Sequence, residues 1–481
     1  MKPLTDRQEK QIYNIIVIFI ILCGIALRIL FFSYGRPLWN DECALALNII
    51  NRLNFFTLLD YNQAAPALFM YASKFFYGIF TNKDLALRII PLISSILSIF
   101  LFYALSVKIL VKKISIYTAL FLFAFCYPLC YYAQEFKQYS TDVFSFLIIV
   151  LSYFYTDKIS SFTYKGKILC GIIYSLLLWL SFSSIFALAA LFFTLLILKP
   201  KILKSLCIPA GITFFNLILA AILNFYITTN SYLHEYWADA FIDQGFIKFL
   251  SLNIENIKYI FNSGIPLFFT LISLVYMIFK KEDLLKNTLI LSPLFLTLLL
   301  SYFRIYPYST RCILFLIPVF ILLCTKISDY INFKVKFINL ILSSIISVIM
   351  IYPVLVNDVY NIIYKNYIEE NLLVPLALAQ KEAQKEDTIY ISDGSEIIYD
   401  YYKHFIKINS NIIVENTRYN NNNEYIKHLE ELPKDRTYYW IIAHHPQKFE
   451  RNAAVYHWAK YKKNFKMYSD GKGNSLIRFS L

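Results

Sequence analysis

Long apolar stretches alternate with short polar breaks from residue 12 to residue 355. A helix that crosses a bilayer needs about 20 mostly apolar residues. On this pattern we predict eleven membrane-spanning helices, at 12–33, 86–107, 114–131, 139–156, 166–182, 184–199, 205–228, 260–279, 285–303, 310–326 and 334–355. The fifth and sixth are separated only by a turn at residues 181–184, because residues 168–198 are otherwise nearly continuous apolar sequence.

Basic residues occur at every second break, beginning with the N-terminus. Lys and Arg are preferentially kept on the cytoplasmic side of a membrane protein. The breaks that we therefore place in the cytoplasm carry Lys2, Arg7, Lys10, Lys108, Lys112, Lys113, Lys158, Lys165, Lys167, Lys199, Lys201, Lys204, Lys280, Lys281, Lys286, Lys326, Lys334 and Lys336. We expect a cytoplasmic N-terminus and three longer segments outside the cytoplasm, at 34–85, 229–259 and after residue 356.

The outer segments have patterns of their own. Residues 42–56 and 66–80 show helical apolar periodicity with polar interruptions, which predicts short helices in the membrane interface. Residues 357–481 are polar and alternate strand-like with helical pieces. Strands are expected at 388–392, 438–443 and 475–479, and helices at 371–385 and 396–405. The predicted fold is an all-α polytopic membrane bundle over 1–356, with a small α/β domain over 357–481 outside the membrane.

Composition agrees with a membrane protein. Hydrophobic residues make up 58% of the chain and charged residues 16%, whereas a soluble domain has about a quarter charged residues. The net charge of +14 could indicate nucleic-acid binding, but most Lys residues lie in the breaks where they set orientation, and no nucleic-acid motif is present. The eight cysteines show no pairing pattern, so we expect no disulfide framework.

The strongest local signal is the segment at residues 38–42, Leu-Trp-Asn-Asp-Glu, directly after the first predicted span. Two adjacent carboxylates beside a Trp at a membrane surface are costly to desolvate. Asp41 or Glu42 could act as a general base or hold a cation. The structural alternative is that Asn40 or Asp41 caps a helix whose first turn Glu42 stabilises.

A second signal is the short outer loop at residues 131–139, which is dense in hydrogen-bonding groups. Glu135 could share a cation with Asp41 or polarise a sugar hydroxyl, and Lys137 could hold a phosphate. The structural alternative is an interfacial loop with aromatic side chains and a Lys that extends toward water.

Arg88 and Arg311 stand at the outer ends of the second and tenth predicted spans. The positive-inside pattern disfavours Arg there, so each needs a partner. An anionic ligand such as a lipid phosphate would suit the bidentate guanidinium. A structural salt bridge or an interaction with lipid headgroups would also account for each.

The remaining candidates are weaker. Residues 230–243 contain His234, Asp239 and Asp243, and a lone His on such a loop is more often solvated than catalytic. His444 and His445 lack a metal-ligand pattern. We find no phosphate-binding Gly-rich loop and no nucleophile elbow in the sequence, which argues against a nucleotide-driven pump.

Five elements follow one another along the chain: residues 38–42, 65–69 (Ala-Pro-Ala-Leu-Phe), 87–91 (Leu-Arg-Ile-Ile-Pro), 132–139 (Tyr-Ala-Gln-Glu-Phe-Lys-Gln-Tyr) and 306–318. In these elements the chain resembles the GT-C membrane glycosyltransferases. The closer resemblance is to the family of protein O-mannosyltransferases and bacterial transferases of aminoarabinose to lipid A (glycosyltransferase family 39 and its bacterial relatives). It is good over roughly the first 160 residues and a matter of layout beyond them. The chain departs from the family at Ala65-Pro66, where two prolines are common, and at Lys137, which replaces an Arg.

The resemblance implies an inverting transfer of a sugar from a polyprenyl-phosphate donor to an acceptor, at the outer face of a bacterial cytoplasmic membrane. The acceptor would be a lipid, a polysaccharide or a protein. By this resemblance the catalytic carboxylates are Asp41, Glu42 and Glu135, of which Asp41 and Glu135 could hold Mg²⁺ or Mn²⁺. The residues expected to bind substrate or phosphate are Arg88, Gln134, Lys137, Tyr139 and Arg311.

Two other classes fit parts of the sequence. A transporter or flippase of lipid-linked glycans would explain many spans and charged membrane residues, and it predicts inverted repeats and broken helices. We find no convincing internal repeat. A non-catalytic envelope scaffold would leave Asp41, Glu42, Arg88 and Glu135 unexplained.

Overall fold

A computed structural model describes residues 5–57, 59–228, 235–279, 284–364, 371–415, 417, 421–442, 449–469 and 474–481. The chain forms two compact units. The first, here called the helical unit, comprises Met1–Tyr34, Asn54–Leu58 and Ala64–Asn366. The second, called the sheet unit, comprises Gly35–Leu53, Leu59–Gln63 and Tyr367–Leu481. The sheet unit thus includes residues 35–53 and 59–63 of the first predicted outer loop, and the boundary that we predicted at residue 356 stays a prediction.

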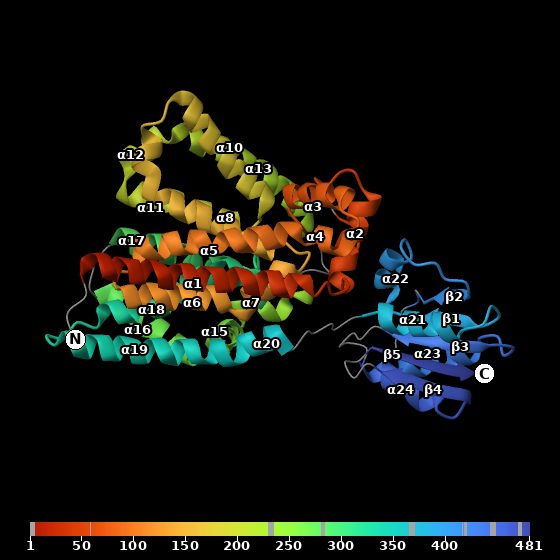
Figure 1. The fold of residues 1–481 in the computed structure, drawn as a ribbon. Coiled ribbons are helices and arrows are strands. Elements are labelled where there is room, and N and C mark those ends of the chain that lie inside the picture. The colour runs from red at the N-terminus through yellow and green to blue at the C-terminus, as the bar shows by residue number, and fades with distance from the viewer. Residues whose placement is uncertain are drawn as a thin grey trace. The chain divides into compact units, whose positions relative to one another are not determined.

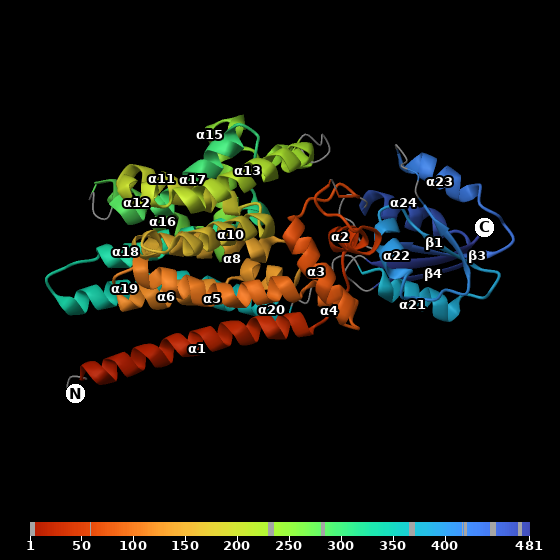
Figure 2. The ribbon, with the colours of Figure 1, turned by 90° about the horizontal axis from the view of Figure 1, so that it is seen from above.

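The helical unit is built from helices that run side by side (Figures 1 and 2). Its longer helices are α1 (Asp6–Ser33), α3 (Ala67–Ile79), α5 (Ile89–Ile109), α6 (Lys113–Phe125), α8 (Tyr139–Ser152), α10 (Tyr164–Leu180), α11 (Ser184–Leu198), α13 (Cys207–Thr228), α15 (Phe246–Phe261), α16 (Ile265–Phe279), α17 (Leu284–Tyr302), α18 (Ile317–Tyr330) and α19 (Lys336–Pro353). Its short segments are α4 (Lys83–Leu87), α7 (Tyr127–Tyr131), η1 (Tyr132–Gln134), η2 (Tyr153–Tyr155), α9 (Thr156–Ser160), α12 (Pro200–Ser205), η3 (Ala238–Ala240), η4 (Ile242–Gln244), η5 (Thr310–Leu316), η6 (Val354–Asp358) and α20 (Val359–Tyr364).

Each of the eleven predicted spans contains a helix. By length and composition five helices within the described ranges can cross a membrane, or seven if two bent pairs each count as one span. Shorter apolar helices lie at Ser184–Leu198, Cys207–Ile222 and Lys286–Tyr302. The chain is therefore a multi-pass membrane protein, and the count of eleven stays a prediction. The predicted turn between the fifth and sixth spans is confirmed, because α10 ends at Leu180 and α11 begins at Ser184.

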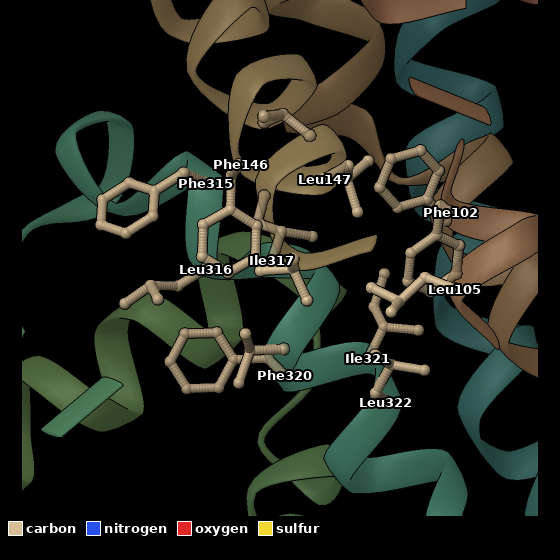
Figure 3. Packing of buried hydrophobic residues seen from close by; sticks show 14 of the residues in the cluster. Phe102, Leu105, Phe146, Leu147, Phe315, Leu316, Ile317, Phe320, Ile321 and Leu322 are labelled. Carbon is tan, nitrogen blue, oxygen red and sulfur yellow. The ribbon is translucent and has the colours of Figure 1, made fainter. Parts of the chain in front are cut away.

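The core of the helical unit lies where α5, α8, η5 and α18 meet (Figure 3). Phe146 of α8 packs against Phe315 of η5 with ring centroids 5.7 Å apart. Phe102 of α5 stacks on Phe123 of α6 at 4.3 Å. Among the five described helices that are long and apolar enough to cross a membrane, Thr310–Tyr330 is the most enclosed, with 83% of its most apolar stretch buried. These contacts pack α8 against η5 and α5 against α6, the helices that lead to the candidate site residues.

Large apolar side chains cover the outside of the helical unit. Phe19, Phe215 and Phe337 are 66%, 69% and 68% exposed. A water-soluble surface rarely presents contiguous apolar area on this scale, whereas lipid chains solvate it. The bilayer therefore accounts for these exposed faces.

Ion pairs and hydrogen bonds join several of the lysine-rich breaks of the helical unit to one another. Lys113 pairs with Glu9 at 3.0 Å, and Lys199 pairs with Asp157 at 2.8 Å. The Lys112 ammonium donates to the Ser328 carbonyl at 2.7 Å. These contacts link the beginning of the third predicted span to the beginning of the first and to the end of the tenth, and the end of the fourth to the end of the sixth. The alternating orientation of the spans stays a prediction.

The sheet unit combines one helix from the first outer segment with the C-terminal domain. Its elements are α2 (Asn40–Asn51), α21 (Leu373–Glu382), β1 (Thr388–Ile391), α22 (Glu396–Tyr402), β2 (Asn411–Val414), α23 (Asn422–Glu430), β3 (Thr437–Ile442), α24 (Phe449–Ala459), β4 (Lys463–Ser469) and β5 (Ser475–Ser480). The strand order is β2-β1-β3-β5-β4. β1 pairs parallel with β2 and β3, while β5 pairs antiparallel with β3 and β4.

The predicted strands at 388–392, 438–443 and 475–479 and both predicted helices are confirmed within a few residues. β2 and β4 were missed by the sequence analysis, as were α23 and α24. The core of the sheet unit is aromatic: Tyr390, Tyr425 and Trp440 are fully buried, and the Trp440 indole donates to the Tyr425 hydroxyl at 3.0 Å.

Candidate active site

Arg88 occupies the junction of two helices in the helical unit. It follows α4 and immediately precedes α5, whose Pro91 lies in the first turn, where a missing N–H costs little. The Arg88 residue is 1% exposed. A buried guanidinium costs several kcal/mol, of the order found for other buried ions, unless negative or polar groups compensate it. The predicted outer-end Arg is therefore enclosed by protein and is not a lipid-exposed anchor.

The second candidate segment folds into a compact turn between α7 and α8. The Lys137 N–H donates to the Glu135 carbonyl at 2.7 Å, and the Ser140 hydroxyl donates to the Tyr132 carbonyl at 2.7 Å. The Tyr132 and Tyr139 rings meet edge-on at 4.9 Å. These contacts hold both ends of the segment together and leave little room for it to move.

The charged side chains of this turn point into the protein. Gln134 and Glu135 are each 1% exposed, and Lys137 is 6% exposed. An interfacial loop with a Lys extended toward water, which was our structural alternative, is therefore wrong. The cost of burying these groups makes the turn a candidate site.

Helix packing brings this turn and Arg88 to the same end of the helical unit. α5, which begins beside Arg88, packs against η1 and α8, the two segments that flank the turn. Phe69 of α3 stacks on Phe136 at 5.6 Å, and α3 also packs against α4 and α5. We call Arg88, Gln134, Glu135, Lys137 and Tyr139 the polar cluster.

Arg311 lies on η5 and contacts two aromatic rings of an earlier segment, those of Tyr236 and Trp237. Its guanidinium lies 5.1 Å from the Trp237 ring and 5.9 Å from the Tyr236 ring. It also donates to the Tyr236 hydroxyl at 3.0 Å. Arg311 is half-buried, so one side of its charge stays accessible.

The acidic residues of the segment at 230–243 have structural partners. Asp243 pairs with Arg304 at 2.6 Å, and Asp239 pairs with Lys248 at 3.9 Å. His234, His444 and His445 lie outside the described residues.

Asp142 is a candidate that the sequence analysis missed. It lies in the first turn of α8, three residues after Tyr139, and is 5% exposed. The Ser181 hydroxyl donates to it at 2.6 Å. An ionisable residue inside a predicted span is a functional candidate by default, and this signal was present at position 142 of the sequence.

Two further buried charges, Arg28 and Asp358, stabilise a broken helix. α6 and α7 meet at a bend of 48°, where Pro128 has no N–H to donate to the Ala124 carbonyl. Arg28 of α1 donates to that carbonyl at 2.7 Å and to the Phe123 carbonyl at 3.4 Å. Asp358 accepts the freed Tyr127 N–H at 2.9 Å. The main-chain groups on both sides of the bend between α6 and α7, which precedes the turn of the polar cluster, are therefore hydrogen-bonded.

In the sheet unit, the two adjacent carboxylates have different surroundings. Glu42 is fully buried, with its carboxylate 3.7 Å from the Arg36 guanidinium, and it accepts the Trp39 N–H at 3.4 Å. Asp41 is only half-buried. Trp39 is the N-cap residue of α2, so the predicted cap at Asn40 or Asp41 is wrong, whereas the predicted role of Glu42 in the first turn is confirmed.

The sheet unit also fixes the start of α2. The Leu38 N–H donates to the Tyr402 hydroxyl of α22 at 2.7 Å, and α2 packs along α22. The acidic motif is thus attached to the C-terminal domain through this hydrogen bond and helix contact.

Metal ligation was predicted at Asp41 and Glu135. Within the part of the chain that the structure describes, no group of three or more His, Cys, Asp and Glu residues could hold a metal ion. Asp41 and Glu135 belong to different units. A divalent cation at these residues stays a prediction.

No protein-family model and no curated protein sequence matches the chain. Solved structures, in contrast, show that it has the fold of the GT-C membrane glycosyltransferases, which confirms the resemblance inferred from the sequence.

Structures of an oligosaccharyltransferase and of ArnT are among those similar to this chain. The Archaeoglobus fulgidus oligosaccharyltransferase, in complex with Zn and sulfate, superposes with a TM-score of 0.57 at 14% identity, covering 96% of this chain and 72% of that chain. ArnT from Cupriavidus metallidurans in the apo state gives 0.56 at 10% identity, covering 95% of this chain and 97% of that chain. ArnT bound to undecaprenyl phosphate gives 0.52 at 10% identity, covering 98% of each chain.

Proposed function

We propose that the protein is an inverting glycosyltransferase that moves a sugar from a polyprenyl-phosphate donor to an envelope acceptor at the outer face of a bacterial cytoplasmic membrane. The observation that carries this proposal is the burial of Arg88, Glu135 and Lys137 at one end of an apolar helical unit. Burying charged side chains in this way costs free energy. A lipid phosphate bound at the membrane surface would offset part of this cost, because the two cations would bind it.

The transfer needs groups that stabilise the departing phosphate. The acceptor oxygen attacks the anomeric carbon, the bond from that carbon to the phosphate oxygen breaks, and the polyprenyl phosphate leaves with the electron pair. Arg88 and Lys137 would stabilise the negative charge that develops on it, since fixed cations in a water-poor site do so without reorganisation. Arg311 would contribute a third charge, and Gln134 and Tyr139 would donate hydrogen bonds.

A base must take the proton from the acceptor hydroxyl. We assign this role to Asp41, because it is half-buried and accessible, while the neighbouring Glu42 is fully buried beside Arg36. Glu42 then acts as a positioning residue. Glu135 would orient the sugar by accepting hydrogen bonds from its hydroxyls.

The fold comparison supports the choice of donor. ArnT was solved with undecaprenyl phosphate bound, and a site of that class in this chain would need cations at the membrane surface. A divalent ion held by Asp41 and Glu135 would supply further charge stabilisation. The lysine pattern supports a cytoplasmic N-terminus and an outer C-terminal domain.

One observation favours a second function. A flippase or transporter of lipid-linked glycans is expected to have broken helices, and the structure has bends of 48° between α6 and α7 and 114° between α15 and α16. The first of these breaks is fixed by Arg28 and Asp358. Reconstituted protein that moves a fluorescent polyprenyl-phosphate sugar across a bilayer, without transferring its sugar, would establish this alternative.

The transfer reaction is tested with Arg88→Ala in purified protein. We expect kcat to fall by about 10²–10³-fold, as when one oxyanion-stabilising donor is removed. The matched control is Lys83→Gln, which removes one positive charge from the adjoining helix α4, where Lys83 donates to the Tyr77 carbonyl and lies over the Tyr77 ring. Equal activities of wild type and Arg88→Ala would remove Arg88 from the reaction.

A further inference from the structure

α15 connects the two parts of the helical unit that carry candidate site residues. Asn256 accepts the Thr310 N–H at 2.8 Å, next to Arg311. Asn253 accepts the Tyr308 hydroxyl at 3.0 Å. Tyr259 donates to the Tyr132 hydroxyl at 3.4 Å, at the start of the turn that bears the polar cluster. The helix therefore links the Arg311 segment to this turn.

A pocket of about 570 Å³ opens beside α15. It is lined by Ser251, Ile254, Glu255, Lys258, Tyr259 and Thr310. Its size falls within the roughly 300–1,000 Å³ of ordinary small-molecule sites. Tyr259 and Thr310 belong both to this pocket and to the hydrogen bonds that α15 makes, so the pocket is directly next to the framework of the candidate site.

Two opposite charges line this pocket without neutralising each other. The side chains of Glu255 and Lys258 are exposed and make no ion pair or hydrogen bond with any residue that the structure describes. Lys248, on the same helix, pairs instead with Asp239. The pocket thus offers an acceptor, a cation, a hydroxyl and an aromatic ring to a ligand.

We propose that this pocket is a subsite for a sugar ring that carries a phosphate or carboxylate group. The Lys258 ammonium binds the anionic group, and the Glu255 carboxylate accepts hydrogen bonds from ring hydroxyls. The Tyr259 ring provides an apolar surface for the C–H face of the sugar. The identification of the sugar as part of a glycan substrate rests on the proposed function; the binding itself does not.

Ligand binding is tested with full-length protein in phosphatidylcholine nanodiscs. Saturation-transfer NMR measures the binding of glucose 1-phosphate and glucose directly. Inorganic phosphate has no carbon-bound protons to observe, so its binding is measured by the displacement of glucose 1-phosphate. We expect glucose 1-phosphate to bind more tightly than either other probe. Lys258→Gln should weaken it at least fivefold while leaving glucose unchanged, and Glu255→Gln should weaken both sugars. The matched control Lys248→Gln, with the same loss of charge on α15, should bind all three probes as the wild type does.

Two results would overturn the subsite. One is equal binding of glucose 1-phosphate to wild type, Lys258→Gln and Glu255→Gln. The other is binding of inorganic phosphate as tight as that of glucose 1-phosphate, which would make the pocket an anion site without sugar recognition.

Kinetics then identify the source of the sugar. If it belongs to the acceptor, Lys258→Gln raises the KM for acceptor at least fivefold and leaves the KM for donor unchanged; if it belongs to the donor, the pattern reverses. Wild-type protein that binds glucose 1-phosphate through Lys258 but transfers no sugar would refute the proposed function and leave the subsite standing. Transfer that depends on Arg88, with probe binding unaffected by Lys258→Gln, would refute the subsite alone.

Discussion

Buried charged side chains in the helical unit have two kinds of surroundings. Arg28 donates to backbone carbonyls and to the Ser95 hydroxyl at 2.8 Å, which identifies it as part of the scaffold. Glu135 and Lys137 instead lie in the turn between η1 and α8, and Arg88 directly precedes α5. Arg28 is therefore assigned to the scaffold by its hydrogen bonds, and a role for Arg88, Glu135 and Lys137 in ligand binding is our proposal.

Asp41 and Glu42 are expected to respond differently to loss of charge. Asp41→Asn should reduce transfer by about 10²–10⁴-fold, the usual contribution of a general base, with little change in thermal stability. Glu42→Gln should lower the melting temperature, because the Arg36 guanidinium, 4% exposed, would lose its partner; removing one member of a buried pair costs about 3–5 kcal/mol. The measurements are transfer rates and melting curves of both variants.

The opposite assignment has a distinct signature. If Glu42→Gln abolished transfer at unchanged melting temperature while Asp41→Asn stayed active, Glu42 would be the catalytic carboxylate. The half-buried state of Asp41 would then have no role in the reaction.

The sequence analysis recognised some site residues and missed others. Arg88, Glu135 and Lys137 stood out because they interrupt apolar runs at predicted helix ends. Arg28 and Asp142 lie inside such runs, and their partners are a backbone carbonyl of another helix and the side chain of Ser181. Contacts of this kind depend on tertiary packing, so position along the chain does not predict them.

At the scale of elements, the bend between α6 and α7 connects packing with the candidate site. α1 approaches the end of α6 closely enough for Arg28 to reach the Ala124 carbonyl. A Cβ at position 24 would lie 2.8 Å from the Ala124 Cβ, so this close approach requires Gly24. The sequence predicted one continuous span at 114–131. It is broken because Pro128 removes a donor, and the side chains that compensate come from distant segments.

We expect Arg28→Met to destabilise the protein by about 1–3 kcal/mol for each carbonyl left without a donor. Pro128→Ala restores an N–H that can bond to the Ala124 carbonyl. In the Arg28→Met background it should therefore recover about 1 kcal/mol, although it should be neutral or destabilising in the wild type. Thermal unfolding of the four proteins as a double-mutant cycle measures this coupling. Strictly additive effects would show that Arg28 does not compensate Pro128.

A second element-scale prediction concerns the edge of the sheet at the ends of β1 and β2. Burial disfavours the charged form of Glu415, but hydrogen bonds from Tyr390 and Thr417 outweigh it and lower the pKa of Glu415. A lowered pKa in the folded state stabilises the fold above the ordinary Glu pKa of about 4.3. This contribution is lost as the pH falls through the lowered value.

Hydrogen exchange detected by mass spectrometry tests this dependence in the full-length chain. Peptides covering Thr388–Ile391 and Asn411–Val414 should exchange faster in Glu415→Gln than in the wild type at pH 7. The difference should shrink as the pH is lowered below about 4. A difference that grows on acidification would contradict the sign of the pKa shift.

For the whole molecule, apolar periodicity was enough to predict a multi-pass helical protein with a C-terminal α/β domain. It did not predict that residues 35–53 group with residues 367–481, because that arrangement depends on contacts such as the one between Leu38 and Tyr402. Apolar periodicity also assigned residues 229–259 to a segment between two spans, whereas most of α15 (Phe246–Phe261) lies within that range. The polar side chains of α15 made it resemble a connection, although Asn253 and Asn256 bind other segments.

Orientation in the membrane is a prediction at this scale. Alkaline phosphatase fusions, which are active only outside the cytoplasm, should be active after Leu481 and within the loop at Arg304 and inactive after Lys112. Green fluorescent protein fusions at the same positions should show the reverse pattern. An active phosphatase after Lys112 would invert the topology and place the polar cluster in the cytoplasm.

Sugar transfer is measured directly with purified protein in liposomes, with a polyprenyl-phosphate sugar radiolabelled in the sugar and an extract of envelope glycans and lipids as acceptor. We expect label to move from the donor to an acceptor molecule and polyprenyl phosphate to be released in equal amount. Arg88→Ala should slow both by about 10²–10³-fold. Label that crosses the bilayer while still attached to its lipid, at a rate unaffected by Arg88→Ala, would contradict the proposed sugar transfer.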